Sequence, residues 1–390
     1  MANNTMSAQQ QQMQMLAANM QARKLIIENA IDSTIPIAGA TVTGGAGTII
    51  NVPIRNVGLL KRLWIEISAT YTNGTGGVLT LSPFGASNII SNVNFTDLSS
   101  QQRINTTGWH LVTVASAKAQ KPYGSAATTD SPCGYGNIFQ KIWQAPSTIA
   151  VSTPGTLNAI YEIPISYSDY DLSGAIYMSV VNATANLQFT LNPNFAVGSA
   201  SDQTNAVYQS AGTTNLGTLT SVTYTVYQNY LDQLPHGSNG QIILPYYDMS
   251  KSYLLNSTVY SGIVQGQDNP FPFANFRNIL STTAVYDNNG VLNTGSDINY
   301  WAIQAANYTN VFKYDPYFAA FLSRLILQDD FPKGMYYFDS RKKPINTVQY
   351  GNMQLLLNPS SAVSASNVQV GYESIALINQ VVAAGSIGGT

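Results

Sequence analysis

The chain has 390 residues, of which 45% are hydrophobic and only 9% are charged, with 17 basic and 19 acidic side chains. This composition excludes a disordered chain, which is poor in hydrophobic residues, and a basic nucleic-acid binder, which needs clusters of Lys and Arg. A charge content so far below the usual value of roughly 25% also predicts that copies of the chain cover much of its surface.

The first 32 residues differ in composition and pattern from the rest of the chain. Apolar residues recur there every seven positions and form one helical stripe: Met6, Met13, Met20 and Ile27. Arg23 and Lys24 are the only charges before Glu28. The pattern predicts a helical arm, 1–32, that packs on its own domain, clamps a neighbouring subunit or touches a membrane surface. Because Met adapts to irregular partners, the residues alone favour subunit packing.

After Asp32 the chain has the pattern of short β-strands. Hydrophobic and polar residues alternate in 63–72, 157–165, 187–191 and 222–230, and clusters of Gly, Pro and Asn separate these segments. Such a pattern predicts a β-sandwich or a barrel. Further on, Asp315 and Pro316 form a helix-start signature. One face of this predicted helix carries Phe318, Phe321, Leu322 and Leu325.

Four short segments of the first half have matches, in the same order, in the second half. The pairs are 88–91 with 278–281, 104–106 with 292–294, 131–132 with 315–316, and 186–193 with 352–359. Their offset shrinks along the chain, as expected if a second copy of one domain has shorter loops. The repeat predicts two β-domains, 33–240 and 241–384, with a seam near the turn formers 234–240, and a flexible tail, 385–390.

The few charges are unevenly distributed. Residues 33–141 hold seven basic and three acidic side chains, whereas residues 142–250 hold six acidic and no basic ones. The plain interpretation is a set of solvated acidic loops. The alternative is electrostatic matching between neighbouring subunits.

Two motifs are candidates for catalysis, and each has a simpler structural explanation. Asp169 or Asp171 with Glu162 would supply the two carboxylates of a glycosidase, but Asp-rich turns are ordinary. Trp109 and His110 lack a nucleophile elbow and triad partners in the sequence. We therefore expect a packed Trp beside a hydrogen-bonded His.

Cysteine and histidine are scarce. A single cysteine, Cys133, excludes an intrachain disulfide, and two His with one Cys cannot form the common zinc sites, so no metal or cofactor is expected. Cys133 has no neighbouring base and is expected to be a small buried hydrophobe. The polar N-terminus lacks the features of a signal peptide.

Eight segments spread over most of the chain carry a resemblance to a known family. They are 108–112, 129–132, 167–175, 223–235, 296–300, 330–337, 348–352 and 371–373. Runs such as Tyr-Leu-Asp-Gln-Leu-Pro, 230–235, are specific when they occur with the others. In these segments the chain resembles the major capsid protein of tectiviruses, bacteriophages with an internal membrane and a double jelly-roll coat.

The resemblance implies an all-β fold: two tandem eight-stranded jelly rolls, with an N-terminal helix and short helices in loops. It implies a structural protein without enzymatic activity, whose pseudo-hexagonal homotrimers tile an icosahedral shell around an internal membrane. The virion would assemble in the bacterial cytoplasm. The implied partners are other copies of the chain, penton (vertex) and minor coat proteins and the surface of the inner membrane, with no direct contact to nucleic acid.

The resemblance also places the helical arm on the inner side of the shell. The residues expected to contact the membrane or the base of the trimer are Met6, Met13, Met20, Arg23 and Lys24. Deletion of 1–27 is then expected to leave trimers folded but to impair assembly of a closed shell. The alternatives from other classes are a glycan-binding β-sandwich of a tail or surface protein, whose 24 tyrosines would stack on sugars, and the glycosidase described above.

Overall fold

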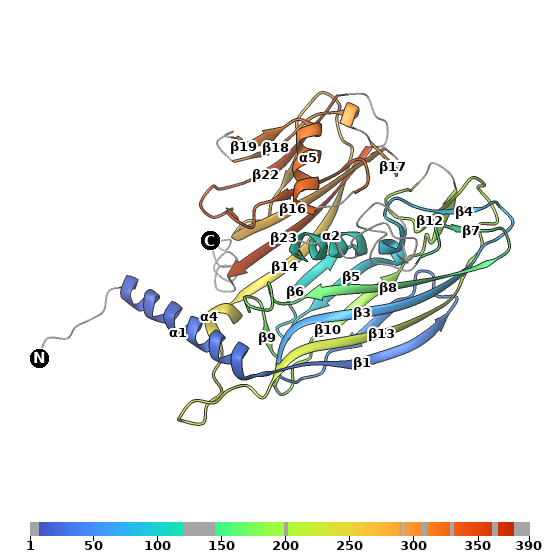
Figure 1. The fold of residues 1–390 in the computed structure, drawn as a ribbon. Coiled ribbons are helices and arrows are strands. Elements are labelled where there is room, and N and C mark those ends of the chain that lie inside the picture. Colours follow the sequence, from blue (N-terminus) through green and yellow to red (C-terminus); the bar gives the residue numbers. More distant parts are fainter. Residues whose placement is uncertain are drawn as a thin grey trace, which may run out of the picture.

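Two β-sandwiches lie side by side in the structure, which is a computed structural model (Figure 1). The structure describes residues 8–119, 145–198, 202–288, 290–293, 295–305, 310–327, 331–360 and 366–377. Met6, Cys133, the segment 131–132 and the predicted tail 385–390 lie outside these residues. Each sandwich has eight main strands in two sheets, which confirms the predicted pair of eight-stranded jelly rolls.

The first jelly roll pairs a sheet of order β1-β13-β3-β8 with a sheet of order β6-β5-β10-β2. The bounds of these strands are β1 Ile31–Thr43, β2 Ile49–Pro53, β3 Leu59–Thr72, β5 Ile90–Thr96, β6 Gln102–Thr106, β8 Pro154–Pro164, β10 Asn186–Leu191 and β13 Thr218–Asp232. Shorter strands lie in its loops: β4 Leu79–Leu81, β7 Thr148–Ile149, β9 Ile176–Tyr177, β11 Ala196–Gly198 and β12 Tyr208–Ser210.

The second jelly roll repeats this topology. Its strands β14, β23, β16 and β20 correspond in order to β1, β13, β3 and β8, and β15, β22, β18 and β19 correspond to β2, β10, β5 and β6. The bounds are β14 Lys251–Ser261, β15 Asn269–Pro272, β16 Arg277–Asn288, β17 Val291–Leu292, β18 Ile298–Gln304, β19 Asn310–Tyr314, β20 Met335–Asp339, β21 Ile345–Asn346, β22 Gln354–Pro359 and β23 Ser366–Leu377.

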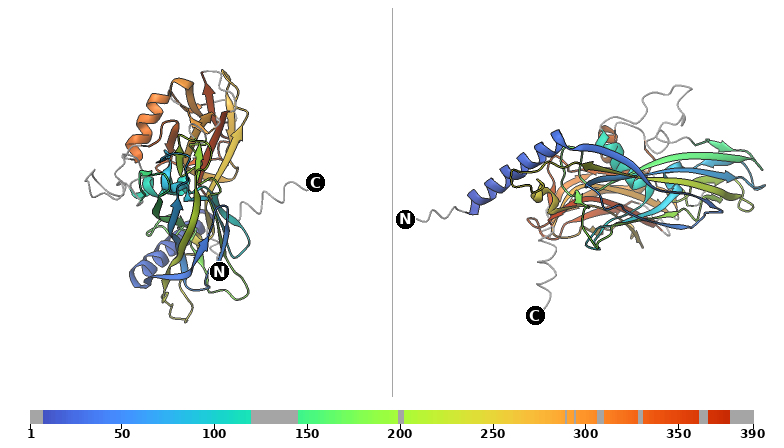
Figure 2. Two further views of the ribbon diagram at one scale, coloured as in Figure 1. Left: turned by 90° about the vertical axis from the view of Figure 1, so that its right-hand side faces the viewer. Right: turned by 90° about the horizontal axis from the view of Figure 1, so that it is seen from below.

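Short helices occupy the loops and the ends of the sandwiches. They are α1 Ala8–Asn29, α2 Gly108–Ala119, α4 Tyr246–Met249 and α5 Pro316–Leu327, with the 3₁₀-helices η1 Gly85–Ile89 and η2 Gly295–Asp297. Helix α2 lies between the two jelly rolls, α5 covers the second, and α1 projects from the end where α4 lies (Figures 1 and 2). No helix among the described residues is long and apolar enough to cross a membrane.

The strands form because their apolar residues alternate with polar ones, so that one face of each sheet enters a core. In β3, Leu63, Ile65 and Ile67 are buried in the core of the first jelly roll, while the residues between them reach the surface. Trp301 and Leu357 belong to the separate core of the second jelly roll. Burial of these side chains is the main contribution that stabilises each sandwich.

The internal repeat is present, but two of the four segment matches do not locate it. Segments 186–193 and 352–359 fall on the equivalent strands β10 and β22. The match of 88–91 with 278–281 is wrong, because it pairs the start of β5 with β16, whose counterpart is β3. The match of 104–106 with 292–294 is wrong in the same way, since β6 corresponds to β19 and not to β17. The match of 131–132 with 315–316 lies partly outside the described residues; among those described, α2 stands in the chain where α5 stands in the second jelly roll.

The number of positions that separates equivalent strands nevertheless decreases steadily along the chain. The first strands begin at Ile31 and Lys251, 220 positions apart, and the last at Thr218 and Ser366, 148 positions apart. The second jelly roll therefore has the shorter loops that the shrinking offset predicted. The predicted boundary at 240 falls in the connection between Asp232 and Lys251.

The helix predicted from Asp315 and Pro316 is α5. The Asp315 carboxylate accepts hydrogen bonds from the backbone N–H groups of Tyr317 and Phe318, as an N-cap does. Its apolar stripe, however, does not enter the core: the buried residues of α5 are Pro316, Ala319, Ser323 and Leu327, whereas Phe318, Phe321 and Leu325 are exposed.

Candidate functional site

The region that holds the two jelly rolls together, called the joint below, is built on α2 and includes His110, Lys118, Gly371 and Glu373. Trp109, at its start, is buried and lies 5.6 Å from the ring of Phe84. Gly108 is required just before it, because a Cβ atom there would lie 2.2 Å from the Ser87 carbonyl oxygen. The expected packed Trp beside a hydrogen-bonded His is confirmed, since Nδ1 of the buried His110 lies 2.7 Å from the Thr106 hydroxyl.

His110 joins the two jelly rolls by packing on a glycine of β23. A Cβ atom at Gly371 would lie 2.4 Å from Cδ2 of the His110 ring, so only glycine allows this approach. Burial lowers the pKa of His110 to about 4, although the charge of Glu373 opposes that shift. The imidazole is therefore neutral at neutral pH. Two of the segments that carried the family resemblance, 108–112 and 371–373, thus meet in space.

A buried ionic cluster lies beside this contact, and Glu373 of β23 is its centre. One carboxylate oxygen accepts from the Tyr253 hydroxyl at 2.8 Å and lies 3.4 Å from Nζ of Lys118. The other accepts from the Ser281 hydroxyl at 2.7 Å and from the Arg341 guanidinium at 2.8 Å. Lys118 comes from α2, so the cluster ties the first jelly roll to the second.

In the cluster each buried charge is stabilised by a neighbouring charge of opposite sign. Burial alone would raise the pKa of Glu373, but Arg341 and Lys118, with the two hydroxyl donors, outweigh it and lower the pKa to about 2. Burial lowers the pKa of Lys118 to about 8 despite the attraction of Glu373. Nζ of Lys118 also lies 4.2 Å from the centre of the Tyr253 ring and donates to the Tyr167 carbonyl. Every charge of this cluster thus has a partner.

Acid should weaken this joint first at His110. The folded state keeps His110 neutral down to about pH 4, whereas an unfolded chain protonates it near 6.5, so stability falls as the pH drops from 6.5 towards 4. We expect a loss of about 1.4 kcal/mol per pH unit, about 3 kcal/mol in total. Urea unfolding measured between pH 6.5 and 4.5 checks this, since protonation of Glu373 begins only below that window.

The control is His110→Phe, which keeps a ring against Gly371 but cannot titrate. This variant should be less stable at pH 7, because Thr106 loses its partner, yet its stability should change much less between pH 6.5 and 4.5. An equal slope for the two proteins would show that His110 does not carry the acid sensitivity.

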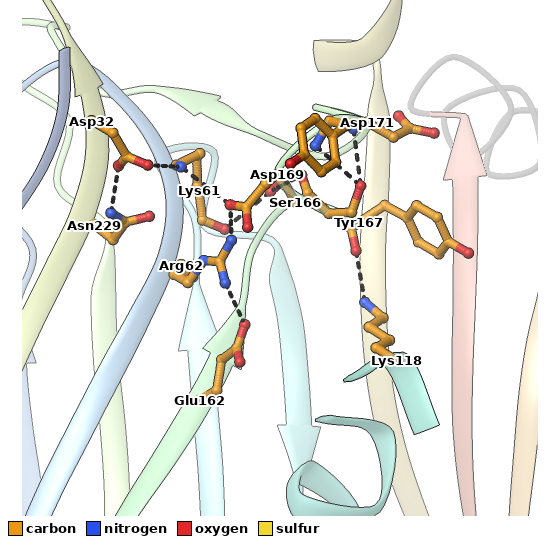
Figure 3. Close-up of polar contacts among 12 residues, drawn as sticks. Asp32, Lys61, Arg62, Lys118, Glu162, Ser166, Tyr167, Asp169, Asp171 and Asn229 are labelled. Carbon is orange, nitrogen blue, oxygen red and sulfur yellow. Dashed lines mark hydrogen bonds and ion pairs between the residues drawn. The ribbon is translucent and has the colours of Figure 1, made fainter. Parts of the chain in front are cut away.

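A second ionic network lies where β3 begins and β8 ends, beside α2 (Figure 3). Nζ of the buried Lys61 donates to Asp32 at 2.7 Å and to Asp169 at 3.2 Å. Asp32 in turn accepts from the Asn229 amide at 2.7 Å. The network lines a cavity of about 230 Å³, in which each of the three cations, Lys61, Arg62 and Lys118, already has a partner in the chain.

This network explains the carboxylates that were candidates for a glycosidase. Arg62 binds Glu162 at 3.0 Å and also contacts Asp169, so one guanidinium joins both groups. Asp171 instead stabilises its own turn by accepting from the backbone N–H of Ser173. The three carboxylates are therefore explained as partners in ion pairs and in a turn of the fold.

The uneven distribution of charge is matched largely within the chain. Four of the acidic residues in 142–250 pair with cations from other segments: Glu162, Asp169, Asp171 and Asp248. Neither solvated loops nor matching between subunits is needed to explain these four residues.

The helical arm packs on its own subunit by its second half only. Asn19, Ala22 and Ile26 are buried, and Ile26 lies in a small cluster with Leu231 and Leu59 at the base of the first jelly roll. Arg23 faces inward and lies 3.5 Å from Asp248 of α4. Met13, Met20 and Lys24, by contrast, are exposed. The predicted contact set is therefore divided: Arg23 binds within the subunit and the other described members face outward.

Comparison with known proteins identifies the family of this chain. Residues 2–234 match the family model described as P3 major capsid protein N-terminal, and residues 250–389 match P3 major capsid protein C-terminal. The chain belongs to the P3 major capsid protein family. It is 36% identical over 380 residues to Major capsid protein P3 of Enterobacteria phage PRD1, covering 97% of this chain and 95% of that protein.

Solved structures show the same fold at low sequence identity. The major capsid protein of Sulfolobus turreted icosahedral virus matches with a TM-score of 0.61 and 12% identity, over 89% of this chain and 97% of that one. PBCV-1 Vp54 matches with a TM-score of 0.52 and 12% identity, over 89% and 94% of the two chains. As a member of the P3 major capsid protein family, the chain is a structural protein of a virion capsid and not an enzyme.

Sequence reasoning missed the residues that complete the joint. Tyr253, Ser281 and Arg341 were not singled out, although they hold Glu373. One signal was available: Glu373 is the only charged residue of β23, in a run of otherwise uncharged residues. A single charge in a buried strand requires partners, but the sequence does not say which strands supply them.

Proposed function

We propose that this P3-family capsid protein forms homotrimers whose six jelly rolls make a pseudo-hexagonal unit of the shell. The observation that supports this most is the joint between the jelly rolls. It fixes two domains of one topology as a rigid pair, so three chains supply six similar domains around one axis. The low charge content agrees with a surface that other copies cover, since large apolar contacts replace charged surface in stable assemblies.

We also propose that the exposed first half of α1 faces an internal membrane. Residues 8–22 carry no charge, and Met13, Met15 and Met20 are exposed, so the helix offers a soft apolar surface beyond the body of the subunit (Figure 2). The exposed Lys24 of the predicted contact set lies 3.8 Å from Glu28, so the apolar methionines and not net charge would carry the membrane contact of the arm.

Closed icosahedral shells need fivefold positions, which a threefold object does not fill by symmetry. A separate penton protein would occupy the vertices, and minor coat proteins would fill the remaining gaps.

Deletion of residues 2–18 tests both proposals. Residues 19–29 of α1, with Ile26 and Arg23, remain to pack on the subunit, so this cut is cleaner than deletion of 1–27. In light scattering, each protein should have three times the mass of its own chain, which is 42.0 kDa for the native protein, and the melting temperatures should be equal. Only the native protein should assemble into closed particles that contain a membrane.

The control replaces Val181, an exposed residue far from the arm in sequence, by Ser. A monomeric native protein would contradict the trimer. Normal membrane-containing particles of the truncated protein would contradict the membrane role, and dissociation of its trimers would show that the arm clamps neighbouring subunits instead.

A further inference from the structure

The second jelly roll has a loop at the end of the subunit from which α1 projects. This loop, called the base loop below, comprises residues 340–353, joins β20 to β22 and contains the short strand β21. β21 pairs with the first residues of β16, and β16 begins opposite the last residues of β23. Lys251 at the start of β14 pairs with Leu377 at the end of β23, and α4 lies just before Lys251. The base loop therefore lies at the same end as α4 and α1 (Figure 1).

The base loop and its neighbours expose apolar and aromatic side chains. Val348 is 47% exposed and Tyr350 is 46% exposed, and Tyr246 on α4 and Phe276, in the turn before β16, are also exposed. A cavity of about 300 Å³ between the base loop and α4 is lined by Tyr247, Phe276 and Val348, which shows that these segments are neighbours. Tyrosine is enriched at membrane–water boundaries, because its ring is apolar and its hydroxyl group is polar.

The backbone at Phe276 is strained. Its φ of 61° lies in the left-handed region, which glycine or asparagine adopts with less steric cost. Residues in such conformations are found mainly at functional sites, where the position of the side chain matters. The turn therefore places an aromatic ring at this end of the subunit at the expense of backbone strain.

Two consecutive lysines give the base loop a positive charge. Lys342 and Lys343 are exposed, and neither has a carboxylate partner within the part of the chain that the structure describes. Arg341, just before them, binds the buried Glu373 instead. Asp339 is exposed at the end of β20, and its carboxylate accepts a hydrogen bond from the backbone N–H of Arg341. The two lysines outnumber this single carboxylate.

The base loop and α1 supply different parts of a contact with phospholipid. The exposed methionines of α1 are apolar, and the one exposed lysine near them, Lys24, pairs with Glu28. The arm therefore has no unpaired cation for a phosphate group. Lys342 and Lys343 supply such cations on long, flexible side chains, which reach phosphate oxygens at a membrane surface while their apolar stems lie along the boundary.

We infer that the base loop binds the phosphate groups of anionic phospholipids through Lys342 and Lys343, with Val348, Tyr350 and Phe276 at the headgroup boundary. The inference rests on the proposed membrane role of α1 and adds a second contact of different chemistry, on the other jelly roll. Membrane binding then has two parts: an apolar part from α1 and an electrostatic part from the base loop, which salt screens.

Vesicle flotation of the native protein measures both parts. Vesicles of phosphatidylglycerol with phosphatidylcholine carry net negative charge, whereas vesicles of phosphatidylcholine alone do not. Lys342→Gln with Lys343→Gln should lower the partition coefficient on the anionic vesicles at low salt at least about thirtyfold, since each lysine near an anionic surface contributes a factor of about five. Binding to phosphatidylcholine alone should not change, and neither should the circular dichroism spectrum, because both side chains are exposed.

Three controls make the test specific to charge and position. Lys342→Arg with Lys343→Arg keeps both charges and should bind as the native protein does. Lys333→Gln removes an exposed lysine just before β20, at the opposite end of that strand from the base loop, and should also bind normally. Deletion of residues 2–18 should instead weaken binding to both kinds of vesicle.

The possible outcomes separate this inference from the proposed membrane role. Equal binding of the native and double Gln proteins to anionic vesicles would overturn the assignment of the base loop and leave the role of α1 intact. Displacement of the native protein by inorganic phosphate at constant ionic strength would also overturn it, since the loop would then bind free phosphate rather than a membrane. A native protein that binds neither kind of vesicle would refute the proposed membrane role itself, and the inference with it.

Discussion

Replacement of Glu373 by Gln will lower the free energy of unfolding by about 3–5 kcal/mol, the range found when one partner of a buried ion pair is removed. The fully buried carboxylate of Glu373 compensates Arg341 and Lys118, and Gln leaves both cations without their anion. Urea unfolding at pH 7 measures the change. The loss should shrink as the pH rises towards 8, because Lys118 without Glu373 has a lower pKa than the value of about 8 in the native chain and releases its proton first in the variant.

The matched control for this variant is Glu162→Gln. Glu162 also pairs with an arginine, Arg62, but both side chains are partly exposed, so the change should be below about 1 kcal/mol. Equal effects for the two variants would contradict the central role of Glu373. A double replacement, Glu373→Met with Arg341→Met, should recover part of the lost stability, since apolar groups in place of a buried pair are often tolerated.

Trp109→Ala should have an effect of similar size, about 3–5 kcal/mol, because it leaves a large cavity in a fully buried position. Trp109 packs against Phe84 of the first jelly roll, and its neighbour His110 contacts Gly371 of the second. The cavity would therefore loosen α2 and with it the joint. Thermal unfolding followed by near-ultraviolet circular dichroism checks this, since it reports on aromatic packing.

Two variants make this prediction specific. Trp109→Phe retains most of the ring volume and should cost clearly less than Trp109→Ala. Trp64→Ala removes a half-buried Trp from the outer face of β3 and should also cost less. If Trp64→Ala destabilised the chain as much as Trp109→Ala, the position of Trp109 at the joint would not matter.

The sequence predicted those strands whose hydrophobic and polar residues alternate because one face is buried, and the helix whose start is marked by local signals. β3 alternates because only one of its faces enters a core, and Asp315 with Pro316 marks the start of α5 by local backbone chemistry. The strand β16 was not predicted, because it is buried on both faces and its sequence therefore does not alternate. The apolar stripe of α5 was predicted correctly, but a stripe does not tell whether its partner lies in the same chain.

The joint could be predicted only in part. The segments 108–112 and 371–373 stood out by their resemblance to the family, yet nothing local shows that His110 requires a glycine at position 371. Lys118 comes from a helix, Ser281 from a strand and Arg341 from the turn after β20, so their convergence on Glu373 depends on the tertiary fold. The arm was assigned as helix, but only the structure separates its inward residues, such as Arg23, from its outward ones.

The pairing of β6 with β14 makes one ten-stranded sheet run through both jelly rolls. Hydrogen bonds between β6 and β14 cross the seam in the middle of that sheet, and α2 with the Glu373 cluster packs on its face. A hinge motion between the two jelly rolls would have to break both the hydrogen bonds of the sheet and the ion pairs of the Glu373 cluster. The subunit therefore behaves as a stiff plate, and a shell under internal pressure would yield between chains rather than inside them.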